Sequence, residues 1–392
     1  MNKRYYDDLI KAGHNPNLEK GMEKSIIAYH TRKQEVLKQF PHMVQLADEV
    51  RKIKEYAVAH QEELVAQASQ NFNNNGAQVH QAQTDEEACE IIGNIVGSGK
   101  IVVSAKTLTG EEISIRDYLE RMHNEVWETD IGQLIQQLRH EKPMHYVFPS
   151  LHVSSSEVAA LLTNLIKKPV PDSIETEVAI CRQFLRDKFT AAHFGLTGSN
   201  VVAADTGALF LIESEGNIRM SSAIPDVHIA LVGIEKIVPT LSDAFKVATT
   251  IFRYAGFTIP KYLSIISGPS STADIENTLV EGSSGPKELH VIFLDNGRKT
   301  LAKEPILKES LYCIKCGSCL FECPVFHAAA GYFGGKGYFG GNGSILNAYL
   351  IKSLDSAAFT NTCLRCGRCN DVCPVSIDVP KLITELRSLI NQ

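Results

Sequence analysis

The stretch Cys313-Ile-Lys-Cys316-Gly-Ser-Cys319-Leu-Phe-Glu-Cys323-Pro324 returns with the same spacing as Cys363-Leu-Arg-Cys366-Gly-Arg-Cys369-Asn-Asp-Val-Cys373-Pro374. Each run is C-x2-C-x2-C-x3-C-P, a spacing typical of the ligands of [4Fe–4S] clusters. Three thiolates at intervals of three residues surround one corner of a cubane, and the fourth, followed by proline, ligates the other cluster. The sequence therefore predicts two [4Fe–4S] clusters near the C-terminus.

The crossed pattern divides the eight cysteines into two sets. Cluster one is assigned to Cys313, Cys316, Cys319 and Cys373, and cluster two to Cys363, Cys366, Cys369 and Cys323. Zinc is the competing metal, since C-x2-C pairs also occur in zinc ribbons. A zinc site takes four ligands and does not require the x3-C-P segment that ends each run, so the pattern favours iron–sulfur clusters.

The other two of the ten cysteines, Cys89 and Cys181, lie in amphipathic helical patterns. A free cysteine there behaves as a small buried hydrophobic residue. The N-terminus, MNKRYYDDLIK, has no apolar segment typical of a secretory signal. Because disulfides belong to oxidising compartments, we expect metal ligation rather than disulfides and a cytoplasmic location, with peripheral membrane attachment through partners left open.

Composition excludes several classes of protein. Hydrophobic residues make up 44% and charged residues 21% of the 392, which is ordinary for a globular chain of two or three domains. No stretch approaches 18 uninterrupted apolar residues, which argues against a membrane-spanning helix. The net charge of −6 gives no electrostatic footprint for nucleic acid, so no nucleic-acid partner is expected.

We predict three domains from the periodicity of the hydrophobic residues. Residues 1–75 have helical spacing with balanced charges and form a helical N-terminal arm. Residues 76–300, the sheet domain, alternate strands and helices, which predicts an α/β fold with a largely parallel sheet. Residues 301–392 form an α-helical ferredoxin domain. The expected strands are 77–82, 100–105, 124–129 and 144–149, followed from residue 194 by short β segments punctuated by glycine.

A glycine-rich loop separates the two cysteine runs. GYFGGKGYFGGNG, residues 331–343, contains a formal G-x-G-x-x-G at Gly335, Gly337 and Gly340. A dinucleotide site needs a strand before this motif and a helix after it, and no hydrophobic strand leads in. We expect a loop that packs over a cluster or faces a partner protein.

Several short motifs resemble a known family. They are Lys106–Thr109 with Glu111-Glu112-Ile113, Glu128-Thr129-Asp130, Thr197-Gly-Ser-Asn200, Asp205-Thr-Gly207, Glu213-Ser-Glu-Gly-Asn217, VHIALVGIEKIVPT at 227–240 and LDNGR at 294–298. Together with the cysteine runs they resemble the LUD-domain family, and within it the LutB-type iron–sulfur subunits of bacterial lactate utilisation. The resemblance implies a sheet domain of the NagB/RpiA/CoA-transferase type.

The resemblance also implies a function. The chain would be the iron–sulfur electron-transfer subunit of a complex that oxidises L-lactate, or a related 2-hydroxyacid, to pyruvate. Its partners would be a cysteine-rich LutA-like subunit and a LutC-like LUD protein, with a quinone or a carrier as an unidentified electron acceptor.

Candidate residues for a 2-hydroxyacid follow from its chemistry. The carboxylate needs a cation, which Lys106, Arg219 or Lys236 could supply, with polar groups such as Thr109 and Asn200 beside it. The hydroxyl proton needs a base with a pKa near neutrality, which His228 or His290 could supply. The alternative is structural: hydrogen-bonded core histidines, surface charges, and an asparagine in a left-handed turn.

Two other functions remain open from the sequence. In the related fold a glutamate forms a covalent acyl intermediate, and Glu213 is a candidate for acyl or CoA transfer. Acyl transfer needs no electrons, however, which makes two fused clusters hard to explain. Because no flavin or nicotinamide signature is visible, the chain could instead be an assembly platform and electron wire, with catalysis in another subunit.

Overall fold

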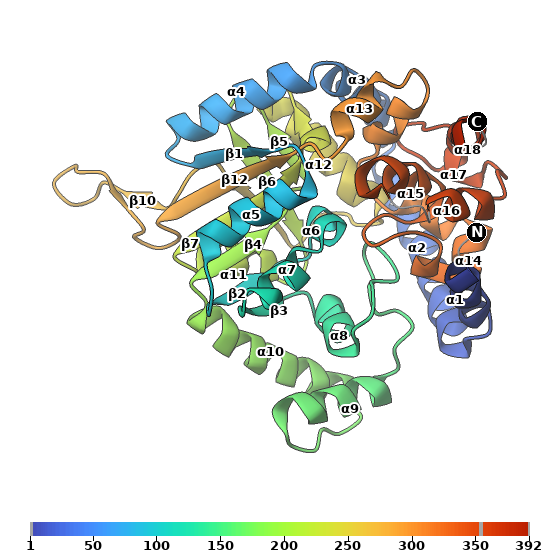
Figure 1. Cartoon of the computed structure of the whole chain (residues 1–392), viewed down its shortest axis with the longest axis horizontal. Coiled ribbons are helices and arrows are strands. Elements are labelled where there is room, and N and C mark those ends of the chain that lie inside the picture. Colours follow the sequence, from blue (N-terminus) through green and yellow to red (C-terminus); the bar gives the residue numbers. More distant parts are fainter. Residues whose placement is uncertain (1–2, 353–355, 391–392) are drawn as a thin grey trace.

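A six-stranded, wholly parallel sheet in the order β1-β12-β7-β4-β2-β3 lies at the centre of the sheet domain (Figure 1). The computed structural model describes residues 3–352 and 356–390. The parallel strands are β1 (Gln78–Ala82), β2 (Ile101–Ser104), β3 (Glu125–Glu128), β4 (Phe194–Thr197), β7 (Val227–Gly233) and β12 (Glu288–Leu294). The predicted mixed α/β class with a parallel sheet is therefore confirmed.

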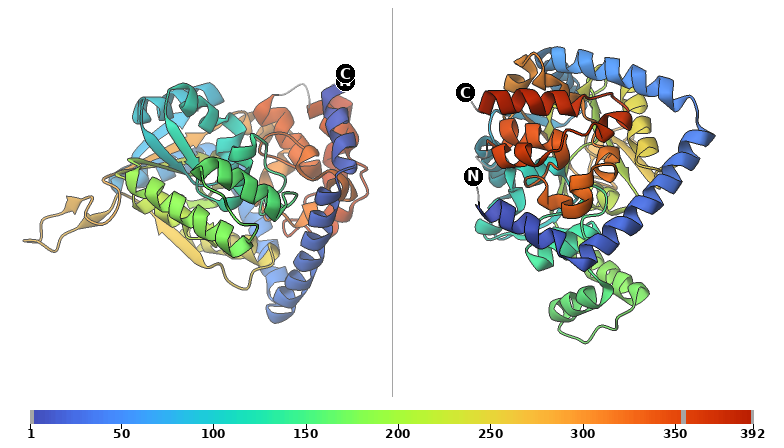
Figure 2. Two further views of the ribbon diagram at one scale, coloured as in Figure 1. Left: turned by 90° about the horizontal axis from the view of Figure 1, so that it is seen from below. Right: turned by 90° about the vertical axis from the view of Figure 1, so that its right-hand side faces the viewer.

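A smaller four-stranded sheet packs beside the first. Its order is β8-β5-β6-β9, and β6 runs antiparallel to both of its neighbours. The strands are β5 (Val201–Ala203), β6 (Ala208–Glu213), β8 (Ile237–Val238) and β9 (Tyr262–Ile266). Two further short strands, β10 (Ser271–Thr272) and β11 (Val280–Glu281), form a hairpin that projects from the body (Figures 1 and 2).

Helices connect and cover the strands. They are α5 (Asp85–Val96), α6 (Leu108–Ile113), α7 (Ile115–Arg121), α8 (Ile131–Arg139), α9 (Ser155–Ile166), α10 (Ile174–Ala191), α11 (Asn217–Ala223), the 3-10 turn η1 (Ile234–Lys236), α12 (Leu241–Tyr254) and α13 (Arg298–Lys303). Local sequence sets their ends: Thr84 caps α5, which stops at Gly97, and Ser154 and Glu157 form a capping box on α9. The α11 segment is helical, although we expected β structure there.

The predicted strand at 144–149 is wrong, since this segment is an irregular loop. Met144 and His145 are fully buried against the ferredoxin domain, where the His145 ring lies 4.4 Å from that of Phe321. The Tyr146 hydroxyl accepts a hydrogen bond of 2.9 Å from the Phe339 N–H. Apolar alternation identified a segment that is buried, but it could not say that the surface burying it was another domain rather than a neighbouring strand.

The described part of the N-terminal arm is helical, as its spacing predicts, and the structure divides it into α1 (Lys3–Gly13), α2 (Pro16–Gln39), α3 (Met43–Ala59) and α4 (Gln61–Asn74). They run around the ferredoxin domain and over the sheet domain (Figure 2). Arg51 on α3 pairs with Glu309 at 2.7 Å and donates to the Val375 carbonyl. Lys54 on the same helix donates to the backbone carbonyl of Glu235 in the sheet domain, so the arm contacts both domains.

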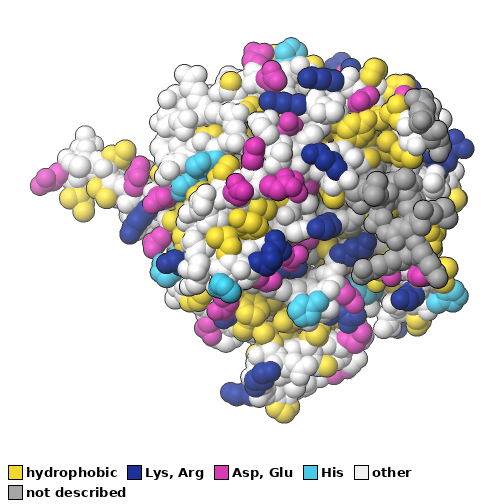
Figure 3. All heavy atoms as spheres, in the orientation of Figure 1, with side chains coloured by type: hydrophobic (Ala, Val, Ile, Leu, Met, Phe, Trp, Pro, Cys, Tyr) yellow, Lys and Arg dark blue, Asp and Glu magenta, His cyan; other side chains and the backbone are white. Residues whose placement is uncertain are grey.

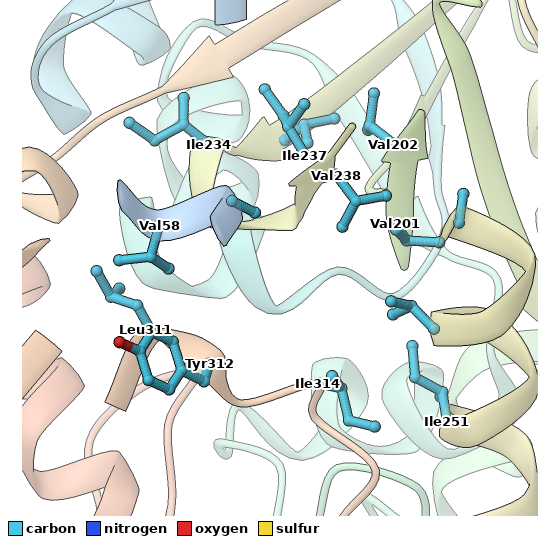
Figure 4. Packing of buried hydrophobic residues seen from close by; sticks show 14 of the residues in the cluster. Val58, Val201, Val202, Ile234, Ile237, Val238, Ile251, Leu311, Tyr312 and Ile314 are labelled. Atoms are coloured by element: carbon cyan, nitrogen blue, oxygen red, sulfur yellow. The ribbon is translucent and has the colours of Figure 1, made fainter. Parts of the chain in front are cut away.

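The ferredoxin domain is built from short helices and turns. They are η2 (Leu307–Tyr312), η3 (Ser318–Phe321), α14 (Pro324–Ala329), η4 (Ala330–Tyr332), α15 (Gly340–Leu346), the π-helical turn η5 (Asn347–Ile351), α16 (Ser356–Thr362), α17 (Arg368–Asp371) and α18 (Val379–Ile390). One hydrophobic cluster continues from Val202 and Ile237 of the small sheet to Leu311 and Ile314 before and within the first cysteine run (Figure 4). The two domains thus share a core.

A buried ionic network joins the domains. Arg298, which is fully buried, makes a bidentate contact with Glu112 at 2.7 and 2.9 Å, and it also pairs with Glu235. The Tyr338 hydroxyl of the glycine-rich loop donates to Glu112 at 2.5 Å. Although burial alone would raise it, the pKa of Glu235 is held at about 2, chiefly by the Arg298 guanidinium. The charges compensate one another only while all of them are present.

We expect Arg298→Met to destabilise the protein by about 3–5 kcal/mol, because it removes the ion-pair partner of two buried carboxylates, Glu112 and Glu235. Thermal unfolding of the anaerobically purified protein, followed by circular dichroism, measures the change. The matched control is Arg139→Met, which breaks a partly exposed contact with Glu141 and Glu157 and should cost about 0–1 kcal/mol. Equal shifts for the two variants would contradict the assigned role of Arg298.

Candidate metal centre and the adjoining cavity

The eight motif cysteines gather in two groups. Cys373 of the second run lies beside Cys316 and Cys313 of the first. Burial, and to a smaller extent these two neighbours, raise the pKa of the Cys373 thiol to about 12. Cys323 of the first run lies beside Cys363 and Cys366 of the second, and burial raises the pKa of its thiol to about 11. The structure thus brings together the crossed sets that the spacing indicates.

The two cysteine runs have matching backbones. Gly317 and Gly367, at the same point of each run, have φ of +80° and +82°, and Lys315 and Arg365 are also left-handed at +60° and +55°. A left-handed residue lets the chain curl tightly, so that thiols three residues apart face one centre.

Backbone N–H groups point at the sulfurs. The Arg365 N–H lies 3.4 Å from the Cys363 Sγ, and the Ile377 N–H lies 3.5 Å from the Cys373 Sγ. Such donors stabilise thiolates and tune the potentials of clusters. Within the described ranges no three His, Cys, Asp or Glu side chains are placed to hold a single metal ion. The donor set of two four-thiol groups fits [4Fe–4S] clusters.

The glycine-rich loop packs over the second group of thiols. Gly340 and Gly341 line a small hollow together with Cys323, Cys363 and Cys366. A Cβ on Gly341 would lie 2.6 Å from Val379 Cγ1 and 3.5 Å from the Cys363 Sγ. Glycine at position 341 therefore allows close packing on Val379 beside the Cys363 thiol, in agreement with the expected loop over a cluster.

A cavity of about 460 Å³ lies between the sheet domain and the first cysteine run. Loops that follow the carboxyl ends of β2, β4 and β7 supply Lys106, Asn200 and Lys236 to its wall. Cys313 and Cys316 line the same cavity from the ferredoxin domain. The carboxyl ends of parallel strands are where α/β proteins usually bind ligands. Here that edge faces the proposed ligands of cluster one.

Two lysines of the cavity lie beside the ionic network. Lys236 follows Glu235 in sequence, and its ammonium donates to Thr109 Oγ1 at 3.1 Å. Lys54 of α3 is 3% exposed and donates to the backbone carbonyl of Glu235. Burial lowers the pKa of each ammonium to about 8. Both cations are therefore positioned next to Glu235, a member of the ionic network.

The structure brings several predicted residues to the cavity. Lys106, Asn200, Glu213 and Lys236 line it, and Thr109 contacts it through Lys236. Asn200 also has a structural contact, because its Oδ1 accepts from the Ile212 N–H at 2.8 Å. The two carboxylate oxygens of Glu213 accept from the Ile218 and Arg219 N–H groups at 2.7 and 3.0 Å. Glu213 is thus held as a cap of α11, which does not favour a role as a free nucleophile.

Other predicted residues lie elsewhere. Arg219 is exposed, and its guanidinium stacks 4.4 Å from the ring centroid of Tyr262. His228 is fully buried near the amino end of β7, and its Nε2 lies 2.8 Å from Thr197 Oγ1. Burial lowers the pKa of His228 to about 3. His290 lies near the amino end of β12, 3.1 Å from His80. Neither histidine lines the cavity.

Sequence reasoning missed Lys54, Lys315 and Arg32, which also line the cavity. Lys315 lies between Cys313 and Cys316, so its place in the motif could have pointed to it. Lys54 and Arg32 belong to the N-terminal arm, where lysine and arginine at helical spacing usually lie in solvent. Only the packing of the arm across both domains places them here.

Comparison with known proteins agrees with this architecture. Residues 65–294 match the LUD domain model, and residues 309–377 match a 4Fe-4S dicluster domain. The chain belongs to the LUD-domain family. The match to the LUD domain and the match to the 4Fe-4S domain together confirm the resemblance seen in the sequence. The dicluster domain implies two iron–sulfur clusters.

Named relatives extend the comparison. "Uncharacterized electron transport protein YkgF" of Escherichia coli K12 is 29% identical over 96% of this chain and 78% of its own length. "Lactate utilization protein B" of Bacillus pumilus is 31% identical, and that of Bacillus subtilis 30% identical, each over 86% of this chain and 70% of the relative. A solved duf162 family protein from Deinococcus radiodurans is 18% identical and covers 60% of this chain and 98% of its own length, with a TM-score of only 0.32.

In the part of the chain that the structure describes, no helix is both long enough and apolar enough to cross a membrane.

The crossed ligand sets can be tested by counting iron. We expect Cys313→Ala to lose roughly half of the bound iron, and Cys313→Ala with Cys373→Ala to lose no more, because both residues are assigned to one cluster. Cys313→Ala with Cys323→Ala should lose nearly all. Iron and sulfide analysis with electron paramagnetic resonance (EPR) spectra of the reduced proteins measures this. Cys89→Ala, a buried cysteine outside both groups, is the control. Complete iron loss from the Cys313/Cys373 pair variant would overturn the crossed assignment.

Proposed function

We propose that this LUD-family protein is the iron–sulfur electron-transfer subunit of a complex that oxidises L-lactate, or a related 2-hydroxyacid, to the corresponding keto acid. Relatives named for lactate utilisation and for electron transport support this. The observation that carries the proposal is that cations at the strand ends and the cysteines Cys313 and Cys316 line the same cavity. An anionic substrate, or a partner's reacting group, placed there would lie next to cluster one.

The assigned ligands give electron transfer a direction. Each [4Fe–4S] cluster, when bound, accepts and releases one electron. In the set assigned to cluster one, Cys316 is buried and lines the cavity. In the set assigned to cluster two, Cys366 is exposed, as are its neighbours Leu364 and Arg365. We infer that electrons enter from the cavity side and leave toward a partner at the Cys366 side.

The proposed division into an arm at 1–75, a sheet domain at 76–300 and a ferredoxin domain at 301–392 assigns a task to each part. The sheet domain holds the anion, the ferredoxin domain carries electrons, and the arm fixes the distance between them through Lys54 and Arg51. A cysteine-rich LutA-like subunit and a LutC-like LUD protein are the proposed partners, and the two-electron step on the substrate belongs to the assembled complex. The physiological acceptor would be a quinone or a soluble carrier.

The test is anaerobic reconstitution with the proteins encoded by neighbouring genes. We expect the mixture to convert L-lactate, or a related 2-hydroxyacid, to its keto acid and to reduce the clusters of this chain, whereas the chain alone stays oxidised. Chromatography of the acids and the EPR spectrum measure the two events.

The control for reconstitution is the Cys313→Ala, Cys363→Ala variant, in which electron transfer should stop although the partners still associate. Oxidation of the acid at the normal rate with this variant would contradict the electron-transfer role. It would favour an assembly platform instead.

A further inference from the structure

The cavity beside Cys313 and Cys316 contains more cations than anions. Its basic residues are Arg32, Lys54, Lys106, Lys236 and Lys315, and its acidic residues are Asp130, Glu213 and Glu215. Each acidic side chain already accepts at least one backbone N–H: Gln133 donates to Asp130, Ile218 and Arg219 to Glu213, and Ile131 to Glu215. The carboxylates are therefore engaged by the protein itself, and none of them forms an ion pair with these cations.

The cations are less fully satisfied. Across residues 3–352 and 356–390, Lys106 has no hydrogen-bond or ion-pair partner. The Lys236 ammonium, with three donors, uses one on Thr109, and that of Lys54 uses one on the Glu235 carbonyl. Withdrawing ammonium groups from water is unfavourable unless acceptors replace the water. These lysines are placed to receive an anion.

Part of the cavity wall is apolar. Helix α12 contributes Val247, Ile251 and Phe252, and Phe257 follows it. Ile314, from the loop between the first two cysteines, belongs to the same hydrophobic cluster as Ile251 (Figure 4). An inorganic anion has no apolar surface to bury against these side chains, whereas an organic acid with an apolar substituent gains binding free energy by burying that substituent there.

The size of the cavity argues for a ligand larger than lactate. Its volume of about 460 Å³ lies within the range of sites for organic ligands of moderate size. Cys319 and Cys373, the other assigned ligands of cluster one, do not line it, so the cavity lies outside that four-thiol group. A three-carbon acid would leave most of the apolar wall against water.

We propose that this cavity binds a 2-hydroxycarboxylate or 2-ketocarboxylate whose substituent is larger than methyl. Lys106 and Lys236 bind the carboxylate, and α12 and Phe257 contact the substituent. The inference rests on the proposed function for the 2-hydroxy or 2-keto group, and on the cavity alone for the charge and size. It makes the sheet domain a substrate-selecting site rather than a passive support for the clusters.

Binding of keto acids to the oxidised holoprotein tests the size preference without turnover. Isothermal titration calorimetry would compare acetate, inorganic phosphate, pyruvate and 4-methyl-2-oxopentanoate. The last has three more apolar carbons than pyruvate, so we expect roughly fiftyfold tighter binding if all three are buried. Its binding should also perturb the EPR signal of the reduced cluster held by Cys313 and Cys316. Equal affinity for pyruvate and 4-methyl-2-oxopentanoate would overturn the size preference, and equal affinity for phosphate would overturn the organic-acid site.

Variants test the charged and the apolar parts of the cavity wall separately. Lys106→Gln should weaken the binding of every carboxylate roughly tenfold or more, because it removes a charged hydrogen-bond donor. Phe257→Ala should weaken the binding of 4-methyl-2-oxopentanoate while leaving the affinity for pyruvate nearly unchanged. Lys246→Gln, which removes an exposed lysine paired with Glu49 outside the cavity, is the control for charge loss and should bind as the unaltered protein does. A similar loss for Lys246→Gln and Lys106→Gln would contradict a specific contact.

The binding experiment separates this inference from the proposed function. If the keto acids bind in the expected order but the reconstituted complex oxidises no 2-hydroxyacid, the proposed function fails and the site stands. If the complex oxidises L-lactate and the holoprotein binds none of the acids, the site fails and the electron-transfer role stands.

Discussion

The bidentate contact between Arg298 and Glu112 is the interaction on which the arrangement of this protein depends. Arg298 begins α13 after the last strand of the parallel sheet, and Glu112 lies on α6 after β2. Tyr338 joins them from the glycine-rich loop, and Glu235 from the turn after β7. These four buried side chains come from three segments of the sheet domain and one of the ferredoxin domain. Because none could be buried alone without a large cost, the domains dock in one orientation.

That orientation creates the cavity. Lys236 follows Glu235, and Lys54 donates to the Glu235 carbonyl, so the network that joins the domains also sets the position of two of the cavity's cations. The same docking places Cys313 and Cys316 opposite the strand ends. Structural and proposed functional roles are therefore coupled here, since a change in the network would move both the cavity lysines and the first cysteine run.

The remaining surface shows no comparable concentration of charge on the face drawn in Figure 3, where basic and acidic side chains are interspersed. The projecting β10–β11 hairpin carries the exposed Ile275 and Leu279, at 76% and 69% exposure. Cys366 and its neighbours Leu364 and Arg365 form another exposed region, which is the proposed exit for electrons.

The sequence by itself determined the features that depend on local spacing. Cysteine intervals predicted two four-thiol groups, and hydrophobic periodicity predicted the helical arm and the alternating strands and helices of the sheet domain. Tertiary structure alone decided which polar residues meet. His228 has the chemistry of a base but lies near the amino end of its strand, while Lys54, 182 residues before Lys236, shares a cavity with it. The loop at 144–149 had a strand's alternation, yet its apolar side chains pack on another domain. Metal-binding motifs and secondary structure depend on residues that are close in the sequence. A site between domains depends instead on how surfaces far apart in the chain are buried together.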